Sequence, residues 1–174
     1  MSRTLVLTAI GNDRPGLVEE ISTVLTNHEG NWLDSSMARL AGKFAGVLTV
    51  EVPDAQEAAL LAALSALASL RVSAEPALGT VADPGYSRRL SFSLVGHDRI
   101  GIVREVSQVF ARHQVNVDKL NTWTSTAPMS SEILFHAAAD LRAGDTLDAD
   151  ALKADLERVS SDLIVDIDLD EQIG

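Results

Sequence analysis

The stretch IGNDRPGLV, residues Ile10–Val18, decides the fold because VGHDRIGIV follows it 85 positions later, at Val95–Val103. Each copy follows a run that alternates apolar and small polar side chains, and each opens a segment whose apolar residues recur at helical spacing. The shared pattern Gly-x-Asp-Arg-x-Gly is therefore predicted to form a turn from a strand into a helix. Backbone N–H groups point outward at such a turn.

The similarity between the two copies extends beyond this turn. The pairs that repeat at the same offset are Leu5 with Leu90, Val18 with Val103, Glu20 with Glu105, Ser22 with Ser107, Val24 with Val109, His28 with His113 and Asn31 with Asn116. A period of this length is too long for a solenoid unit and suits two small duplicated domains. We predict domains over residues 1–80 and 88–174, joined by a linker over 81–87 that contains Pro84 and Gly85.

The composition and charge exclude some classes of protein. Hydrophobic residues make up 46% of the chain and aromatic residues only 4%, so the core is expected to consist of Leu, Val, Ile and Ala. Two domains this small leave much surface exposed, and we expect them to pack on each other or on a second copy of the chain. A formal net charge of −11 argues against nucleic-acid binding, which depends on clustered Lys and Arg. The expected state is a homo-oligomer that does not bind DNA directly.

Signals for other classes of protein are weak. The chain has no cysteine, which excludes disulfides, thiolate metal sites and thiol nucleophiles. Residues 1–4 pass directly into strand-like sequence without the features of a signal peptide, and no apolar run reaches membrane-spanning length. We therefore expect a cytoplasmic protein without membrane contact and without a cofactor.

Each half is predicted to run strand, helix, strand, strand, helix, strand. The expected strands are 5–10, 31–40, 44–52 and 71–77 in the first half and 90–94, 116–126, 129–138 and 162–170 in the second. The first half is expected to have a helix from Gly16 to about His28 and another that begins at Pro53-Asp54, and the second half repeats their apolar stripes at Ile102–Phe110 and at Leu152, Leu156 and Val159. This is the split βαβ order of a ferredoxin-like sandwich, an α+β fold with two helices on one face of an antiparallel sheet. No segment is left for a helix-turn-helix unit or a catalytic domain.

The repeated turn is the first candidate for a binding site. Uncapped amides at a helix N-terminus bind a carboxylate or a phosphate, while Asn12 or Asp13 could meet an ammonium group nearby. An α-amino acid carries both groups. The alternative is that Asp13 and Asp98 only cap their helices.

The turn Gly11–Val18 on a βαββαβ pattern resembles the ACT domain, a small-molecule-binding regulatory module. Two such units without an attached enzyme, with Asn31 and Asp34–Met37 in the first and Asn116 and Leu120–Thr122 in the second, are similar to the glycine cleavage system transcriptional repressor family. That resemblance implies a non-enzymatic protein that binds an amino acid such as glycine and acts on a separate DNA-binding activator.

The resemblance also implies where the ligand binds. ACT units commonly pair side by side, and effectors commonly lie between the first loop of one unit and the second strand of its neighbour. The residues that correspond are Asn12, Asp13, Gly16, Leu17 and Asn31 in the first unit and His97, Asp98, Gly101, Ile102 and Asn116 in the second. Ile100 replaces Pro15 and His97 replaces Asn12, so we expect the first loop to be the better site.

Asn31 and Asn116 have an alternative role as left-handed turn residues after a helix.

Other polar residues have simpler interpretations. The four histidines lack a second ligand at helical spacing, so no metal site is expected. The acidic residues of 166–170 alternate with apolar ones and indicate a solvated strand face rather than a calcium site. Ser35 and Ser36 do not lie in a Gly-x-Ser-x-Gly turn, and no catalytic residue is expected.

Two other functions fit the same pattern. The ACT-like units could form only a dimerisation or interaction module whose loops bind nothing. They could also form a detached regulatory subunit of an enzyme of amino-acid metabolism. The orientation of Asn12 and Asp13, towards a pocket or into helix capping, separates the first alternative from the sensor hypothesis.

Overall fold

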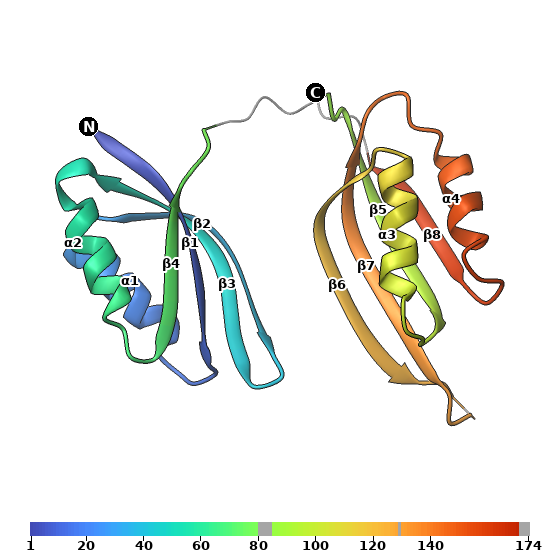
Figure 1. The fold of residues 1–174 in the computed structure, drawn as a ribbon, viewed down its shortest axis with the longest axis horizontal. Coiled ribbons are helices and arrows are strands. Elements are labelled where there is room, and N and C mark those ends of the chain that lie inside the picture. The colour runs from blue at the N-terminus through green and yellow to red at the C-terminus, as the bar shows by residue number, and fades with distance from the viewer. Residues whose placement is uncertain (80–84, 129, 171–174) are drawn as a thin grey trace. The chain divides into compact units, whose positions relative to one another are not determined.

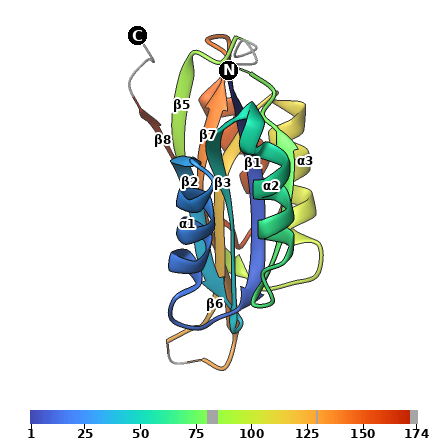
Figure 2. The ribbon, with the colours of Figure 1, turned by 90° about the vertical axis from the view of Figure 1, so that its left-hand side faces the viewer.

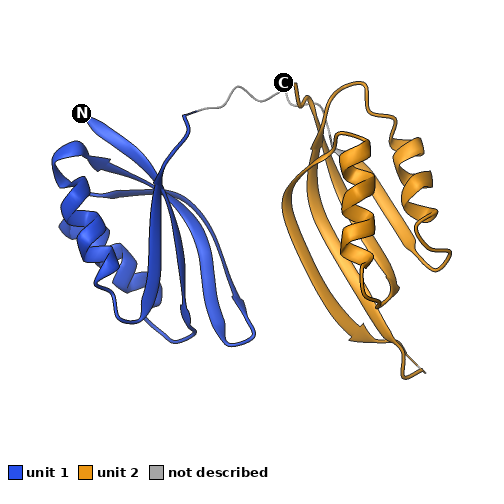
Figure 3. Cartoon of the chain, viewed as in Figure 1, with its two compact units in different colours: residues 1–80 blue, residues 81–174 orange. Residues whose placement is uncertain are grey.

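The computed structural model describes residues 1–79, 85–128 and 130–170. The chain divides into two compact units, unit 1 over residues 1–80 and unit 2 over residues 81–174 (Figure 3). Most of the predicted linker, residues 81–84, lies outside the described residues, so its bounds stay a prediction.

Unit 1 has the predicted order of elements (Figure 1). Its elements are β1 (Ser2–Asn12), α1 (Leu17–Asn27), β2 (Asn31–Leu40), β3 (Lys43–Pro53), α2 (Asp54–Ser65) and β4 (Leu70–Pro76). The antiparallel sheet has the strand order β2-β3-β1-β4. Figure 2 shows α1 and α2 side by side against one face of this sheet. The ferredoxin-like prediction is therefore confirmed for this unit.

Unit 2 repeats this architecture. Its elements are β5 (Arg88–His97), α3 (Ile102–Arg112), β6 (Asn116–Thr126), β7 (Ile133–Ala143), α4 (Ala149–Glu157) and β8 (Ile164–Asp170), with the strand order β6-β7-β5-β8. The predicted strand 129–138 is wrong in its bounds, because residues 130–132 form no strand and β7 continues to Ala143. Residue 129 itself lies outside the described residues.

Each unit has its own apolar core between the sheet and the helices, and the core of unit 2 also contains Phe92, Phe110 and Phe135 beside the predicted aliphatic residues. Alternate residues of the central strands point into it, such as Leu5 and Leu7 of β1 and Leu90 and Leu94 of β5. The helices contribute their apolar stripe, for example Ile21 and Leu25 of α1. Every second residue of each strand therefore faces away from the helices, and the β1–α1 and β5–α3 turns lie at the end of each core.

Candidate functional site

The turn of unit 1 leaves the start of α1 without a side-chain cap. The N-cap is Gly16, whose φ of 92° lies in the left-handed region that favours glycine, and no described side chain accepts a hydrogen bond from the first helical amides. The alternative in which Asp13 caps the helix is therefore wrong. Its backbone N–H donates to the carbonyl of Gly42 at 2.9 Å, and its carboxylate pairs with Arg39 Nε at 2.5 Å. The amides of the first turn stay available to a ligand.

The turn of unit 2 begins its helix in the same way. Gly101 is the N-cap of α3 with φ of 93°, and again no described side chain caps the helix. The Asp98 backbone N–H donates to the carbonyl of Ile133 at 2.9 Å, which corresponds to the bond from Asp13 to Gly42. Asp98 therefore does not cap its helix either.

Each turn is held by its own arginine–glutamate pair. Arg14 contacts Glu20, which also accepts a hydrogen bond from Ser69, and Arg99 holds Glu105 through two bonds of 3.1 and 2.5 Å. The hydrogen bond from Ser69, with help from Arg14, lowers the pKa of Glu20, and the bond from Arg99 lowers the pKa of Glu105. Both motif arginines are thus occupied in positioning their own loops.

Cations lie beside the turn of unit 1. Lys43 Nζ donates to the side-chain oxygen of Asn12, and Arg39 lies against Asp13. A hollow of about 430 Å³ adjoins Asn12 and Lys43 and is lined on its other side by the end of α2, the connection Leu67–Ser69 and the start of β4. The combination of open helix amides and nearby cations favours an anionic group at this end of unit 1.

The turn of unit 2 has acidic surroundings instead. His97 lies between two carboxylates, with Nδ1 3.2 Å from Asp162 Oδ2 and Nε2 3.1 Å from Glu132 Oε2. The hydrogen bond from Ser160, followed by the bond from the His97 backbone N–H, lowers the pKa of Asp162 to about 2. Leu134 pairs with His97 where Lys43 pairs with Asn12 in unit 1. The two turns therefore differ in charge as well as in sequence.

Two of the predicted ligand residues can act only through the backbone. The side chains of Leu17 and Ile102 are each 3% exposed and pack in the cores of their units. Their N–H groups begin the helices at Gly16 and Gly101. The Ile102 N–H already donates to the carbonyl of Arg99 at 3.4 Å, so a ligand at the turn of unit 2 would have to compete for this amide. A ligand at the turn of unit 1 would meet the Leu17 amide and not its side chain.

The predicted asparagines lie at the other end of each sheet. On β3, the partner of Asn31 is Glu51 and the partner of Asn12 is Lys43, eight residues away. At about 3.4 Å per residue this separates the two positions by about 27 Å. Asn116 and His97 are separated on β7 in the same way, through Arg142 and Leu134. No single unit brings its predicted asparagine to its predicted loop.

The asparagines are also not the turn residues after the helices. Asn31 and Asn116 are the first residues of β2 and β6. The left-handed positions are Glu29 and Gln114, each with φ of 56°. The alternative role of the asparagines in those turns is therefore wrong.

Chemistry of other kinds has little support in the described residues. Over residues 1–79, 85–128 and 130–170, no group of three or more His, Asp or Glu side chains is arranged to hold a metal ion. No helix in this part of the chain is long and apolar enough to cross a membrane.

Comparison with known structures supports the fold over the whole chain. A protein of unknown function from Galdieria sulphuraria is 28% identical, with a TM-score of 0.79 and full coverage of both chains. A protein described as a candidate glycine cleavage system transcriptional repressor is 20% identical, with a TM-score of 0.71 and coverage of 98% of this chain and 99% of that one. At 20% identity, this second similarity supports the fold and carries no conclusion about function.

Comparison of sequences identifies the family. A UPF0237 protein from Methanopyrus kandleri is 46% identical over 50 residues, which are 29% of this chain and 56% of that relative. Residues 3–72 and residues 91–160 each match the ACT domain family, whose members are typically regulatory and bind small molecules such as amino acids. The chain therefore belongs to the ACT domain family and consists of two ACT domains in tandem.

Proposed function

We propose that the protein is a non-enzymatic regulator that binds an amino acid and changes the activity of a partner protein. The observation that carries the proposal is the turn before α1, where Lys43 and Arg39 contact Asn12 and Asp13 and the helix that follows has no side-chain cap. These groups suit the carboxylate of an amino acid, and Asp13 suits its ammonium group. Arg39 is 70% exposed, so its pair with Asp13 is weak enough for a ligand to compete.

The complete site needs a second ACT unit. Asn31 lies about 27 Å from the turn of its own unit. Antiparallel pairing of the edge strand β2 with the edge strand of another unit would bring the start of one strand to the end of the other. The asparagine of one unit would then lie near the turn of its neighbour, and a ligand could bridge the two.

Such a bridge gives a mechanism of signalling. A ligand that contacts two units stabilises the arrangement in which they are paired, by the difference between its affinities for the paired and unpaired states. Couplings of about 1–3 kcal/mol are typical of such systems. A partner that recognises the paired arrangement would then bind more or less tightly. A transcriptional activator is the first partner to test, and glycine the first ligand, because a neighbour of the same fold is described as a candidate glycine cleavage repressor.

The binding site can be tested with the twenty amino acids. We expect one of them, with glycine first, to stabilise the full chain by about 2.7 kcal/mol when present at 100 times its dissociation constant. Thermal unfolding identifies the ligand, and calorimetric titration then measures its affinity for native protein, Asp13→Ala and Asp98→Ala. Asp13→Ala should weaken binding at least tenfold, while Asp98→Ala, the matched change in unit 2, should leave it within twofold. Equal losses in both variants would contradict the assignment to unit 1.

A ligand-free interaction module is the second candidate function. Its support is the edge strand β6, in which ten of eleven residues are exposed, among them the apolar Val117 and Leu120, which line a hollow together with the exposed Val103 of α3. If none of the twenty amino acids raises the unfolding midpoint while the chain still self-associates, this function replaces the sensor.

A further inference from the structure

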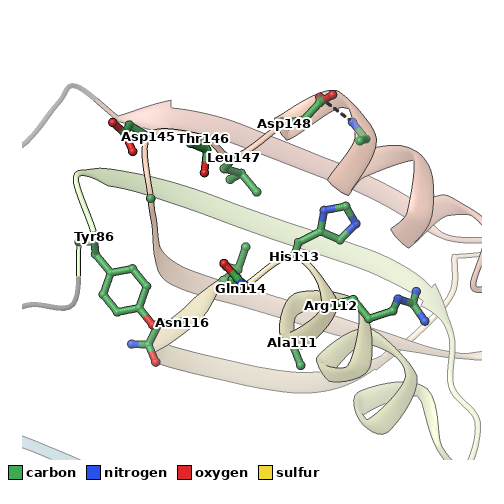
Figure 4. Close-up of a pocket in the computed structure, with 14 residues that line it drawn as sticks. Tyr86, Ala111, Arg112, His113, Gln114, Asn116, Asp145, Thr146, Leu147 and Asp148 are labelled. Carbon is green, nitrogen blue, oxygen red and sulfur yellow. Dashed lines mark hydrogen bonds between the residues drawn. The ribbon is translucent and has the colours of Figure 1, made fainter.

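A cavity in unit 2 lies at the end of the sheet opposite the ACT turn. It measures about 880 Å³ and is bounded by the C-terminal turn of α3, the start of β6 and the connection from β7 to α4 (Figure 4). Volumes of about 300–1,000 Å³ are usual for small-molecule sites. Of the ligand residues predicted for unit 2, Asn116 lines this cavity, whereas His97 and the helix amides at Ile102 do not. No described residue of unit 1 lines it, so the cavity is separate from the Asp13 turn that carries the proposed function.

An insertion in unit 2 creates this cavity. In unit 1, β3 ends at Pro53 and α2 begins at the next residue, Asp54. In unit 2, the five residues 144–148 separate β7 from α4. The extra loop forms one wall of the hollow, which the duplicated fold by itself does not explain.

Hydrogen bonds hold the inserted loop in place. The Leu147 N–H donates to the carbonyl of Gly144 at 3.2 Å, and the Arg88 side chain donates to the carbonyl of Leu147 at 2.9 Å. Asp148 caps α4 by accepting from the Ala151 N–H at 3.0 Å. This wall is fixed before any ligand arrives, which lowers the ordering cost of binding.

The opposite wall is fixed as well. Gln114 has a φ of 56°, and its N–H donates to the carbonyl of Ala111 at 3.1 Å. The next N–H, of Val115, donates to Phe110 at 2.9 Å, and His113 pairs with Asp155 at 2.9 Å. The turn that presents Gln114 and Asn116 is therefore anchored to both α3 and α4.

The side chains around the cavity favour a planar, uncharged ligand. Two carboxamides, those of Gln114 and Asn116, line the hollow together with the ring of Tyr86 and the apolar Leu147 (Figure 4). Carboxamides can form paired hydrogen bonds with the edge of a nucleobase, and aromatic rings stack on its face. Asn116 donates one bond to Asp118 at 2.8 Å, which leaves its carbonyl oxygen for a ligand.

The charges around the cavity disfavour a phosphate. Asp145 and Asp148 lie on the inserted loop, opposite the single arginine Arg112 of the lining. Arg142 lies over the Tyr86 ring, 5.4 Å from its centre, and its charge is matched by Asp118 at 2.6 Å. We propose that this cavity binds a nucleoside or free nucleobase, with Gln114 and Asn116 at the base edge and Tyr86 at the base face.

The only tyrosine of the chain provides a direct probe. Because Tyr86 is the single tyrosine, ring-labelled tyrosine gives one set of NMR signals for the full-length protein. Adenosine, guanosine, cytidine and uridine are titrated separately, with AMP as the phosphate-bearing comparison. We expect saturable shifts of the Tyr86 signals with at least one nucleoside, at a dissociation constant below about 1 mM, and weaker binding of AMP.

Three variants assign the effect to the cavity. Asn116→Ala should weaken nucleoside binding at least tenfold, and Ala111→Trp, an exposed position that lines the hollow, should abolish it. Glu29→Ala, at the position of unit 1 that corresponds to Gln114, should leave it unchanged. The proposal is overturned if no nucleoside gives saturable shifts at 10 mM, if Asn116→Ala and Ala111→Trp both bind normally, or if AMP binds more tightly than adenosine. Amino-acid binding at Asp13 is measured separately, so either proposal can fail without the other.

Discussion

Single residues give the two ACT turns opposite electrostatic surroundings. In unit 1 the turn is neighboured by Lys43 and Arg39, whereas in unit 2 the equivalent region contains Glu132 and Asp162 around His97. Duplication has therefore kept the backbone of the turn, with a left-handed glycine before each helix, and changed its electrostatic surroundings. A shared ligand at both turns is not expected from these charges.

Asp162 should make the stability of unit 2 sensitive to acid. Its folded-state pKa of about 2 lies below the ordinary value of 3.8, so the ionised form stabilises the fold. This contribution is complete above about pH 4 and is lost as the pH falls towards 2. We expect Asp162→Asn to cost about 1 kcal/mol at pH 7, a value reduced for solvent screening, and much less at pH 2.5.

Urea unfolding of native protein and Asp162→Asn at pH 7, 4, 3 and 2.5 measures this difference. Ser160→Ala removes the hydrogen bond that contributes most to the shift, so it should show a smaller loss with the same dependence on pH. A stability difference that stays constant from pH 7 to pH 2.5 would contradict the role of the charged carboxylate.

At the scale of elements, periodicity predicted most of the fold. The alternation of apolar residues in β1 and β5 and the helical stripes of α1 and α3 gave the βαββαβ order correctly. The end of β7 was missed because three of its buried residues, Ala137, Ala139 and Ala143, are weakly apolar, and Leu141 is the single strongly apolar residue beyond the predicted end at Ala138. Alanine carries little of the hydrophobic contrast on which such predictions depend.

The candidate site was predicted less completely, for reasons of distance in the sequence. Asp162 lies 65 residues and Glu132 35 residues from His97, so no local pattern joins them. The separation of Asn31 from its own turn also depends on strand pairing, which the sequence does not state. Local motifs identified the backbone of the turn, and tertiary contacts decided its chemistry.

Gly11, the first glycine of the repeated motif, allows β1 to pack closely against the start of β4. A Cβ on Gly11 would lie 2.4 Å from the carbonyl oxygen of Ser69, immediately before β4, where backbone must move to make room. We expect Gly11→Ala to destabilise unit 1 by about 1–3 kcal/mol. Gly79→Ala is the control, because a Cβ added there would have no described atom within 4 Å. Urea unfolding compares the two, and equal stabilities would show that the β1–β4 junction relaxes freely.

At the scale of the whole molecule, the edges of the sheet in unit 2 differ in their protection. The edge strand β8 carries Asp166 and Asp168, and charges of this kind discourage pairing with another strand. The other edge, β6, has no charged residue or proline over Leu120–Thr126. Leu120 of this strand and Val103 of α3 are exposed apolar side chains around one hollow. The β6 edge is thus the surface of unit 2 best suited to pair with another strand.

We therefore expect the chain to self-associate through the β6 edge. Leu120→Asp places a charge among the apolar side chains there and should reduce the mass in solution to that of one chain, as measured by light scattering during size-exclusion chromatography. Ile164→Asp is the matched control, because Ile164 is 66% exposed on the opposite edge strand, and it should leave the mass unchanged. If the native protein has the mass of one chain at every concentration, or if both variants dissociate equally, pairing through β6 is wrong. The proposed amino-acid site uses β2, the corresponding edge of unit 1, so a paired state that persists in Leu120→Asp would show that β2 pairs without β6 and would contradict association through β6.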